Sequence, residues 1–155
     1  MTTKLLDFLV PEAVILGMQA QSSEEIIKAV GAKLFEAGYV HDTFVDNALT
    51  REKNIPTGLP LGGEYNAAIP HTDIVHVIKS GVGLATLAQE VPFQNMVNPE
   101  ETVPVRLVFV LALDQPKSQV EMLQEVAGVL QNPALVKELV DADSVETLLQ
   151  ALKKA

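Results

Sequence analysis

Apolar residues follow two different spacings along this chain of 155 residues. Short runs of consecutive apolar residues are typical of buried β-strands. Longer stretches in which an apolar residue returns every three or four positions are typical of amphipathic helices. Residues 103–113 are apolar at nearly every position, as expected of a central strand buried on both faces. The runs together predict strands over residues 13–18, 80–88 and 103–113, a strand end at 67–69 and an extended segment at 74–78.

The helical spacing begins and ends at residues that commonly cap helices. Ser22 stands three positions before Glu25, as in a capping box, and predicts a first helix over residues 23–37. Asp42 is an N-cap candidate for a second helix, whose last turn holds residues 51–53. Later helices are predicted over residues 118–131, from Pro133 and from Ser144. This succession predicts an α/β fold, in which a mixed central β-sheet is flanked by helices on both faces.

Two segments interrupt these spacings. Residues 54–66 are dense in glycine and proline and predict a shaped loop, and residues 92–102 also have the composition of a loop. His71 follows Ala-Ala-Ile-Pro directly. Because proline is poorly tolerated inside a central strand, His71 is predicted to be the first polar residue beyond a strand end. A titratable ring held at a strand end beside a glycine-rich loop is where a site is expected in an α/β protein.

Composition and charge narrow the classes of function. The formal net charge of −9 argues against nucleic acid as a partner and favours a basic protein. The chain has no cysteine, which excludes a disulfide, a thiolate ligand and a thiol nucleophile. No apolar segment approaches the roughly 18 residues of a membrane span. We therefore expect a cytoplasmic protein without direct membrane insertion, built as a single domain over residues 1–155.

His71 is the first candidate for chemistry, because an imidazole with the usual pKa of about 6.5 is a usable nucleophile or base near neutral pH. The alternative is a histidine that only caps the strand through hydrogen bonds. Arg51 can hold a phosphoryl group or a carboxylate by two parallel hydrogen bonds, or it can be a solvated arginine at a helix end. Thr57 lies in a loop whose backbone N–H groups can face an anion. That loop lacks the Gly-Lys-Ser/Thr of a phosphate-binding loop.

The spacing of His71, Asp73 and His76 suggests metal ligands. A zinc site takes three or four ligands, and only His41 and carboxylates remain to complete one. We therefore expect neither a metal nor a cofactor. The sequence also contains no nucleophile elbow of the Gly-x-Ser-x-Gly type and no Gly-x-Gly-x-x-Gly motif.

Three short motifs, taken together, resemble a known family. Arg51-Glu52, Pro56-Thr57-Gly58 and Ala68-Ile69-Pro70-His71 follow one another within about twenty residues. Their order is similar to the signature of the EIIA domains of the fructose–mannitol branch of the bacterial phosphotransferase system. Within that branch the chain looks most like the galactitol-specific EIIA, because of Val40-His41-Asp42-Thr43, the long loop before Ala68, and Ile74-Val75-His76 soon after the histidine.

The resemblance implies a mannitol-EIIA-like fold and a phosphotransferase activity. In such a protein HPr is the phosphoryl donor and His71 the acceptor. Arg51 stabilises the phosphoryl group, and Thr57 contributes a loop contact. The phosphoryl group then passes to a cysteine of EIIB, which serves the membrane subunit EIIC during uptake of galactitol or a related sugar. The partners implied are thus HPr and EIIB directly and EIIC indirectly.

One position departs from the family pattern. Many relatives carry a second histidine at the start of the helix after the central strand, and here Gln119 occupies that place. Its amide can donate a hydrogen bond but cannot carry a positive charge. His76 is a candidate for the missing second histidine, although an odd separation from His71 would place it on the other face of a continuous strand.

Two other functions stay open at this point. A regulatory EIIA-like module would also take a phosphoryl group on His71, but it would signal to a transcription factor or a transporter. In an α/β binding domain His71 would be structural and would accept no phosphoryl group.

Overall fold

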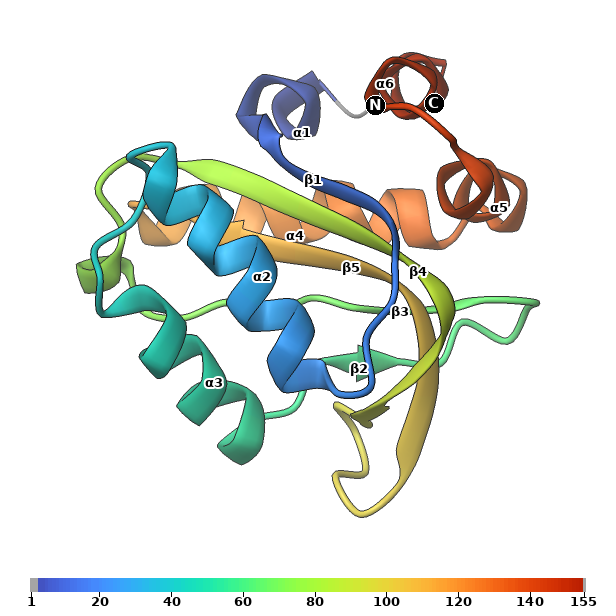
Figure 1. Ribbon diagram of the computed structural model, residues 1–155, viewed down its shortest axis with the longest axis horizontal. Coiled ribbons are helices and arrows are strands. Elements are labelled where there is room, and N and C mark those ends of the chain that lie inside the picture. Colours follow the sequence, from blue (N-terminus) through green and yellow to red (C-terminus); the bar gives the residue numbers. More distant parts are fainter. Residues whose placement is uncertain (1–2, 155) are drawn as a thin grey trace.

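The computed structural model describes residues 3–154, which form a five-stranded sheet with helices on both faces (Figure 1). The order of strands in the sheet is β1-β4-β5-β3-β2. The strands are β1 (Leu9–Met18), β2 (Gly58–Leu59), β3 (Asn66–Ala68), β4 (Gly81–Gln94) and β5 (Thr102–Ala112). The helices are α1 (Thr3–Phe8), α2 (Ser23–Glu36), α3 (Phe44–Asn54), α4 (Pro116–Leu130), α5 (Pro133–Asp141) and α6 (Val145–Lys153), with a 3₁₀ turn η1 at Ile74–His76.

The sheet mixes parallel and antiparallel pairs. β4 and β5 are antiparallel, β1 lies parallel to β4, and β3 lies parallel to β5, with the short β2 antiparallel to β3. β5 is a central strand, and it is buried at every position from Leu107 to Ala112. The prediction of a buried central strand over residues 103–113 is therefore confirmed.

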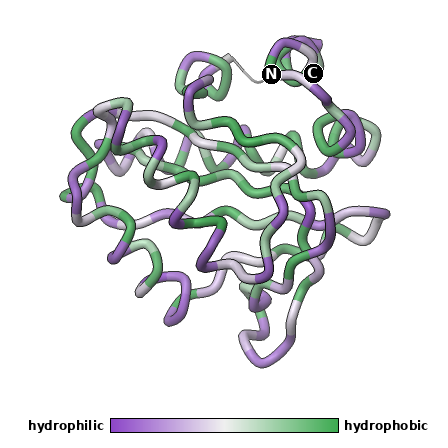
Figure 2. Tube along the Cα trace, viewed as in Figure 1, coloured by the Kyte–Doolittle hydropathy of each residue, from purple (hydrophilic) through white to green (hydrophobic). Residues whose placement is uncertain are grey.

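Hydrophobic side chains gather on both faces of the sheet. One buried cluster joins the sheet to α1, α4, α5 and α6, and a second joins its opposite face to α2 and α3. Leu84 and Phe109 belong to the first cluster, whereas their neighbours Ala85 and Val108 belong to the second, because successive side chains of a strand point to opposite faces. Figure 2 shows hydrophobic colouring along these strands. The predicted α/β architecture is confirmed.

Within residues 3–154, three helices begin at a side-chain cap, and two of these caps, Ser22 and Ser144, were predicted as helix starts. The hydroxyl of Ser22 accepts a hydrogen bond from the backbone N–H of Glu25 at 3.3 Å. α2 is followed by Gly38 in the left-handed region, with φ of 86°, where a glycine is favoured. Asn132 and Ser144 cap α5 and α6 in the same way as Ser22 caps α2.

Two predictions near the site are wrong. Asp42 does not cap α3, because the N-cap is Thr43, which lies in a helical conformation and makes no side-chain capping bond. The extended segment predicted over residues 74–78 is wrong for Ile74–His76, which form a single 3₁₀ turn closed by the backbone bond from Val77 to Ile74. Val77 is extended and forms an isolated bridge with Val40. The apolar run was read as a strand, but two of its apolar side chains face solvent, since Val75 is 71% exposed and Ile78 is 52% exposed.

Two further differences lie in the sheet and at the beginning of the chain. β4 continues to Gln94, although residues 92–102 were predicted to be a loop, because Pro92 and Phe93 pair with Pro104 and Val103 of β5. Long-range pairing therefore outweighs the local proline signal. α1 was not predicted, since it has only six residues and too few turns for a period. Within residues 3–154, none of the helices is both long and apolar enough to span a membrane.

Candidate active site

His71 lies at the edge where β3 leaves the sheet. β3 runs parallel to β5 through Ala68, and the chain stays against β5 because the backbone N–H of Leu111 donates to the carbonyl of Pro70 at 2.9 Å. His71 itself forms an isolated bridge with Leu111. The ring is therefore partly buried at the end of the sheet, as the Ile-Pro-His sequence predicts.

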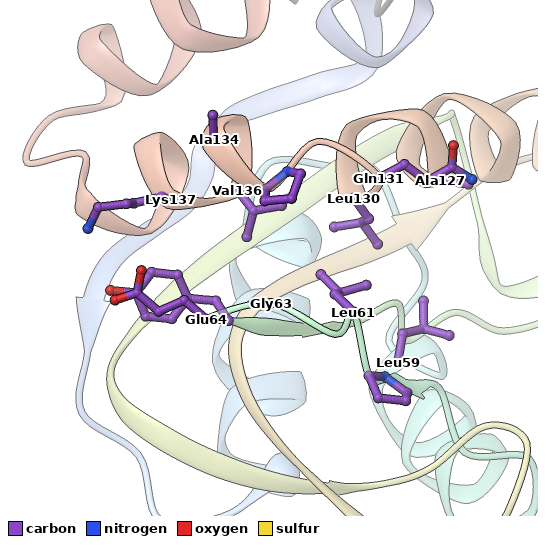
Figure 3. Close-up of a pocket in the computed structure, with 13 residues that line it drawn as sticks. Leu59, Leu61, Gly63, Glu64, Ala127, Leu130, Gln131, Ala134, Val136 and Lys137 are labelled. Carbon is purple, nitrogen blue, oxygen red and sulfur yellow. The ribbon is translucent and has the colours of Figure 1, made fainter.

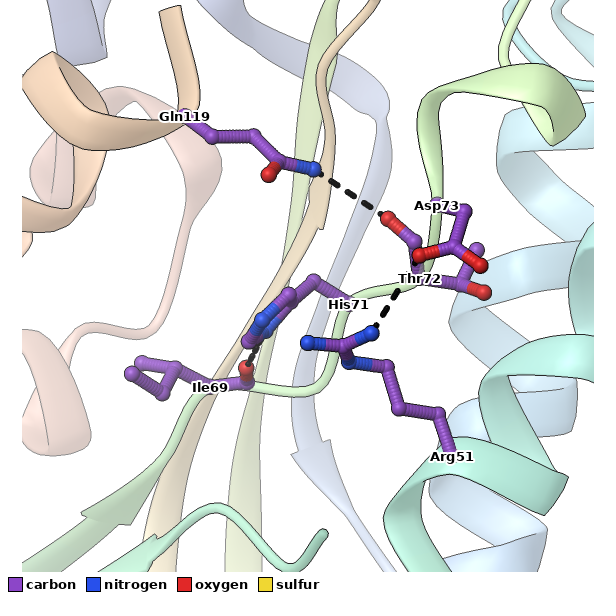
Figure 4. A network of polar contacts seen from close by, with 6 residues as sticks. All are labelled: Arg51, Ile69, His71, Thr72, Asp73 and Gln119. Atoms are coloured by element: carbon purple, nitrogen blue, oxygen red, sulfur yellow. Dashed lines mark hydrogen bonds and ion pairs between the residues drawn. The ribbon is translucent and has the colours of Figure 1, made fainter. Parts of the chain in front are cut away.

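A short hydrogen bond determines the protonation of the His71 ring. Its Nδ1 atom lies 2.8 Å from the carbonyl oxygen of Ile69 (Figure 4). A carbonyl oxygen can only accept, so Nδ1 carries the hydrogen in the neutral ring. Nε2 then holds the lone pair and is the nucleophilic atom. Sequence reasoning had left the partner of the second ring nitrogen without a name.

The surroundings of His71 favour its neutral form. Burial lowers the pKa of the ring below its ordinary 6.5 and is the largest effect. The bond to Ile69 opposes this shift, the positive charge of Arg51 adds to it, and the negative charge of Asp73 opposes it. Because the net direction is downward, the imidazole is neutral at pH 7 and its Nε2 lone pair is free to react.

Arg51 reaches the His71 segment from the last turn of α3, as predicted. Its Nη1 lies 3.3 Å from Oδ1 of Asp73, and this pair is partly exposed (Figure 4). An exposed ion pair contributes little to stability, so an anion near His71 can replace Asp73 at the guanidinium at little cost. Among residues 3–154, Nε of Arg51 is buried without a hydrogen-bond partner. The arginine therefore has unused donor capacity beside the ring.

Thr57, for which a phosphoryl contact was predicted, is hydrogen-bonded to Glu52 and Ile69 in this structure. Its backbone N–H and its hydroxyl both donate to the carboxylate of Glu52, each at 2.8 Å. Its hydroxyl oxygen accepts the backbone N–H of Ile69 at 3.2 Å. Both donors of Thr57 are thus directed at a buried acid, and the residue connects the loop to the segment that carries His71.

Gln119 lies close to the site, and His76 has a different partner. The Nε2 of Gln119 donates to the carbonyl of Thr72 at 3.2 Å (Figure 4). Arg51 and Gln119 therefore reach the His71 segment from helices that pack on opposite faces of the sheet. The ring of His76 hydrogen-bonds through Nδ1 to the hydroxyl of Thr43 at 2.8 Å. A role for His76 in transfer stays a prediction.

Two other features of the chain do not belong to this site. Within residues 3–154 no three His, Asp or Glu side chains gather as metal ligands. A groove of about 630 Å³ lies between the loop from Leu59 to Tyr65 and the adjoining ends of α4 and α5 (Figure 3). None of the residues that line it belongs to the His71 contacts described above.

Sequence reasoning missed two contributors to the site. Glu52 was noticed only as a neighbour of Arg51, and Ile69 only as an apolar residue of the strand end. The burial of an acidic side chain and the direction of a backbone carbonyl have no signature in a single sequence. For Glu52, the one hint in the sequence is its place in an Arg-Glu pair that precedes a Thr-Gly loop.

The fold and the site define a class of protein, namely an α/β domain that presents a neutral histidine beside an arginine for transfer of an anionic group. Residues 7–155 match the family model described as phosphoenolpyruvate-dependent sugar phosphotransferase system, EIIA 2, and the chain belongs to that family. EIIA components are phosphotransferases that pass phosphoryl groups to EIIB. The resemblance seen in the sequence is thereby confirmed.

Individual relatives agree with this assignment. The galactitol-specific EIIA component of Escherichia coli (strain K12) is 31% identical over 124 residues, which cover 80% of this chain and 81% of that protein. The crystal structure of mannitol IIA from Escherichia coli has a TM-score of 0.78 and 28% identity, covering 93% of this chain and 98% of that one. The complex of mannitol IIA with phosphorylated mannitol IIB from Escherichia coli contains a similar chain, with a TM-score of 0.76, 27% identity and coverage of 95% and 98%.

Proposed function

We propose that this chain accepts a phosphoryl group from HPr on Nε2 of His71 and passes it to a cysteine of EIIB, for the coupled uptake and phosphorylation of galactitol or a related sugar. The observation that carries the proposal is the hydrogen bond from Nδ1 of His71 to the Ile69 carbonyl. It leaves one ring nitrogen free, in a ring kept neutral by burial, beside an arginine. We propose that residues 1–155 act as one phosphocarrier domain in the cytoplasm.

The transfer balances in atoms and charge. The lone pair of Nε2 forms a bond to phosphorus while the bond between phosphorus and the donor histidine breaks, and the donor ring takes the electron pair. His71 becomes a phosphorylated imidazolium whose Nδ1 hydrogen stays on the Ile69 carbonyl. When a cysteine thiolate of EIIB attacks the phosphorus, His71 leaves as a neutral ring. Retention of the Nδ1 hydrogen therefore makes the ring a better leaving group.

Arg51 is the donor proposed for the phosphoryl oxygens. Its weak, exposed contact with Asp73 can be exchanged for an oxygen of the arriving group. The buried Nε is a further donor that has no partner among residues 3–154. Gln119 is proposed to assist through its amide, because it already holds the carbonyl of Thr72 next to His71. Thr57 is proposed to act only by holding Ile69, whose backbone N–H donates to its hydroxyl.

The proposed partners agree with charge and with the relatives. The net charge of −9 attracts a basic surface on a donor or an acceptor protein. The mannitol IIA of Escherichia coli, which this chain resembles, has been solved in complex with phosphorylated mannitol IIB. This similarity supports EIIB as the acceptor.

The test is phosphorylation followed by discharge. The chain is incubated with phosphoenolpyruvate, enzyme I and HPr, and its intact mass is measured for wild type, His71→Ala and the control His76→Ala. We expect one acid-labile phosphoryl group in wild type and in His76→Ala, and none in His71→Ala. Addition of a galactitol EIIB should then remove the group. Failure of wild type to take a phosphoryl group from phosphorylated HPr would overturn the proposal, and acceptance without discharge to EIIB would favour a regulatory module.

A further inference from the structure

The carboxylate of Glu52 is buried, and it is connected to the His71 ring through Thr57 and Ile69. Glu52 is only 8% exposed, and its two oxygens accept from the backbone N–H and the hydroxyl of Thr57, each at 2.8 Å. Burial of a carboxylate is costly unless hydrogen bonds compensate it, and these two bonds come from a single residue. The proposed phosphoryl transfer gives Glu52 no role, because both of its hydrogen bonds described here are made with Thr57 and not with His71.

When Glu52 is ionised, the hydrogens in this series of contacts have only one arrangement. Thr57 has a single hydroxyl hydrogen, and its Oγ1 lies 3.2 Å from the N–H of Ile69, which can only donate. The hydroxyl therefore accepts from Ile69 and donates to Glu52. The carbonyl of the same Ile69 accepts the Nδ1–H of His71. A continuous series of hydrogen bonds therefore connects the His71 ring, the backbone of Ile69, the hydroxyl of Thr57 and the carboxylate of Glu52.

We propose that Glu52 is a positioning residue, which acts through Thr57 to hold Ile69 so that its carbonyl keeps the hydrogen of His71 on Nδ1 and leaves Nε2 free. The catalytic consequence rests on the proposed function, whereas the effect on the ring does not. Pro70 follows Ile69 and has no N–H, so the peptide that carries this carbonyl has no N–H with which to make a hydrogen bond of its own. The hydrogen bond from the N–H of Ile69 to the hydroxyl of Thr57 therefore holds Ile69, and with it this carbonyl, in position.

A purely structural Glu52 would have different consequences. It would join the end of α3 to the loop, and its loss would lower stability without any change in the His71 ring. A positioning Glu52 predicts that the balance between the two neutral forms of the ring depends on the hydroxyl of Thr57. The two roles are therefore separated by a measurement on His71 itself.

The experiment compares the unphosphorylated full chain with Thr57→Val, Thr57→Ser and Glu52→Gln by ¹⁵N NMR of the His71 ring. Valine has the shape of threonine but no hydroxyl, and serine keeps the hydroxyl. The glutamine amide must turn its NH₂ toward one of the donors of Thr57. Leu87→Ala is the control for lost stability, because Leu87 is a buried residue of the same hydrophobic cluster as α3 and is not part of the series.

We expect wild type, Thr57→Ser and Leu87→Ala to keep the hydrogen on Nδ1, and Thr57→Val and Glu52→Gln to show a substantial Nε2–H population. Phosphoryl acceptance should fall by about tenfold or more in the last two variants, as for a misplaced reacting group, and recover in Thr57→Ser. An unchanged ring in folded Thr57→Val and Glu52→Gln overturns the inference. A shifted ring in a protein that accepts no phosphoryl group supports the positioning role and contradicts only the proposed function.

Discussion

The Nδ1 atom of His71 lies 2.8 Å from the carbonyl oxygen of Ile69, a residue two positions earlier in the chain. Pro70 stands between them and restricts the turn that brings the ring back onto the carbonyl. A local backbone contact therefore decides which ring nitrogen is nucleophilic. The Ile-Pro-His sequence supplies the partner, and the pairing of β3 with β5 holds it in place.

The first prediction concerns the phosphorylated atom. Because the Ile69 carbonyl occupies Nδ1, the phosphoryl group should reside on Nε2 of His71. Phosphorus–nitrogen couplings in a ¹⁵N-histidine-labelled, phosphorylated chain distinguish the two isomers. A phosphoryl group found on Nδ1 would contradict the assignment of the nucleophile.

The second prediction concerns the titration of His71 in the unphosphorylated chain. Its pKa should lie below 6.5, because burial disfavours the charged ring. Arg51→Gln removes a positive charge and should raise this pKa, whereas Asp73→Asn removes a negative charge and should lower it. An NMR titration of the His71 ring measures all three proteins. Shifts in the same direction in both variants would rule out the electrostatic explanation.

The lowered pKa has a consequence for stability. Between the folded pKa and 6.5 the unfolded chain binds more protons than the native chain, so stability due to His71 rises with pH through that window and is level above it. Burial raises the pKa of Glu52 above its ordinary 4.5. The contribution of Glu52 to stability therefore falls as the pH rises above 4.5. The difference in unfolding free energy between wild type and His71→Gln, measured by urea titration at several pH values, isolates the histidine. That difference should grow from low pH toward 6.5.

The third prediction concerns Gln119. Gln119→Ala removes one partly exposed hydrogen bond to Thr72 and should cost no more than about 1 kcal/mol in unfolding free energy. Gln119→Glu should slow phosphoryl acceptance more than Gln119→Ala does, because a carboxylate opposes both the Thr72 carbonyl and the arriving anion. Gln124→Glu, at an exposed position of the same helix, is the matched charge control. Equal rates in the two glutamate variants would show that only net charge matters.

The fourth prediction compares Gly58, in β2, with Gly63, in the loop that follows β2. A Cβ on Gly58 would lie 2.6 Å from the backbone oxygen of Gln94 and 3.1 Å from Cβ of Phe93, whereas one on Gly63 would meet nothing within 4 Å. Gly58→Ala should therefore lower the unfolding free energy by about 1–3 kcal/mol, as other overpacked sites do. Gly63→Ala should have little effect. Thermal denaturation of both variants tests the difference, and equal melting temperatures would contradict it.

The elements near the site differ in how far the sequence predicts them. The α2 capping box and the apolar run of β5 depend on neighbours along the chain, and both were predicted within a few residues. The end of β4 depends on pairing with β5, so its proline was misread as a loop signal. Ile74–His76 were misread because exposed apolar side chains imitate a strand.

By itself the sequence determined the α/β class, the family and the two residues proposed for the chemistry, His71 and Arg51. These follow from the local spacing of apolar residues, from the Pro-His sequence and from short motifs whose order can be read directly along the chain. Only the tertiary structure decided which ring nitrogen of His71 keeps its lone pair free, that Thr57 donates to Glu52, and that Gln119 holds Thr72. Hydrogen bonds depend on distance and direction in space, and the packing of α3 and α4 against opposite faces of the sheet sets both.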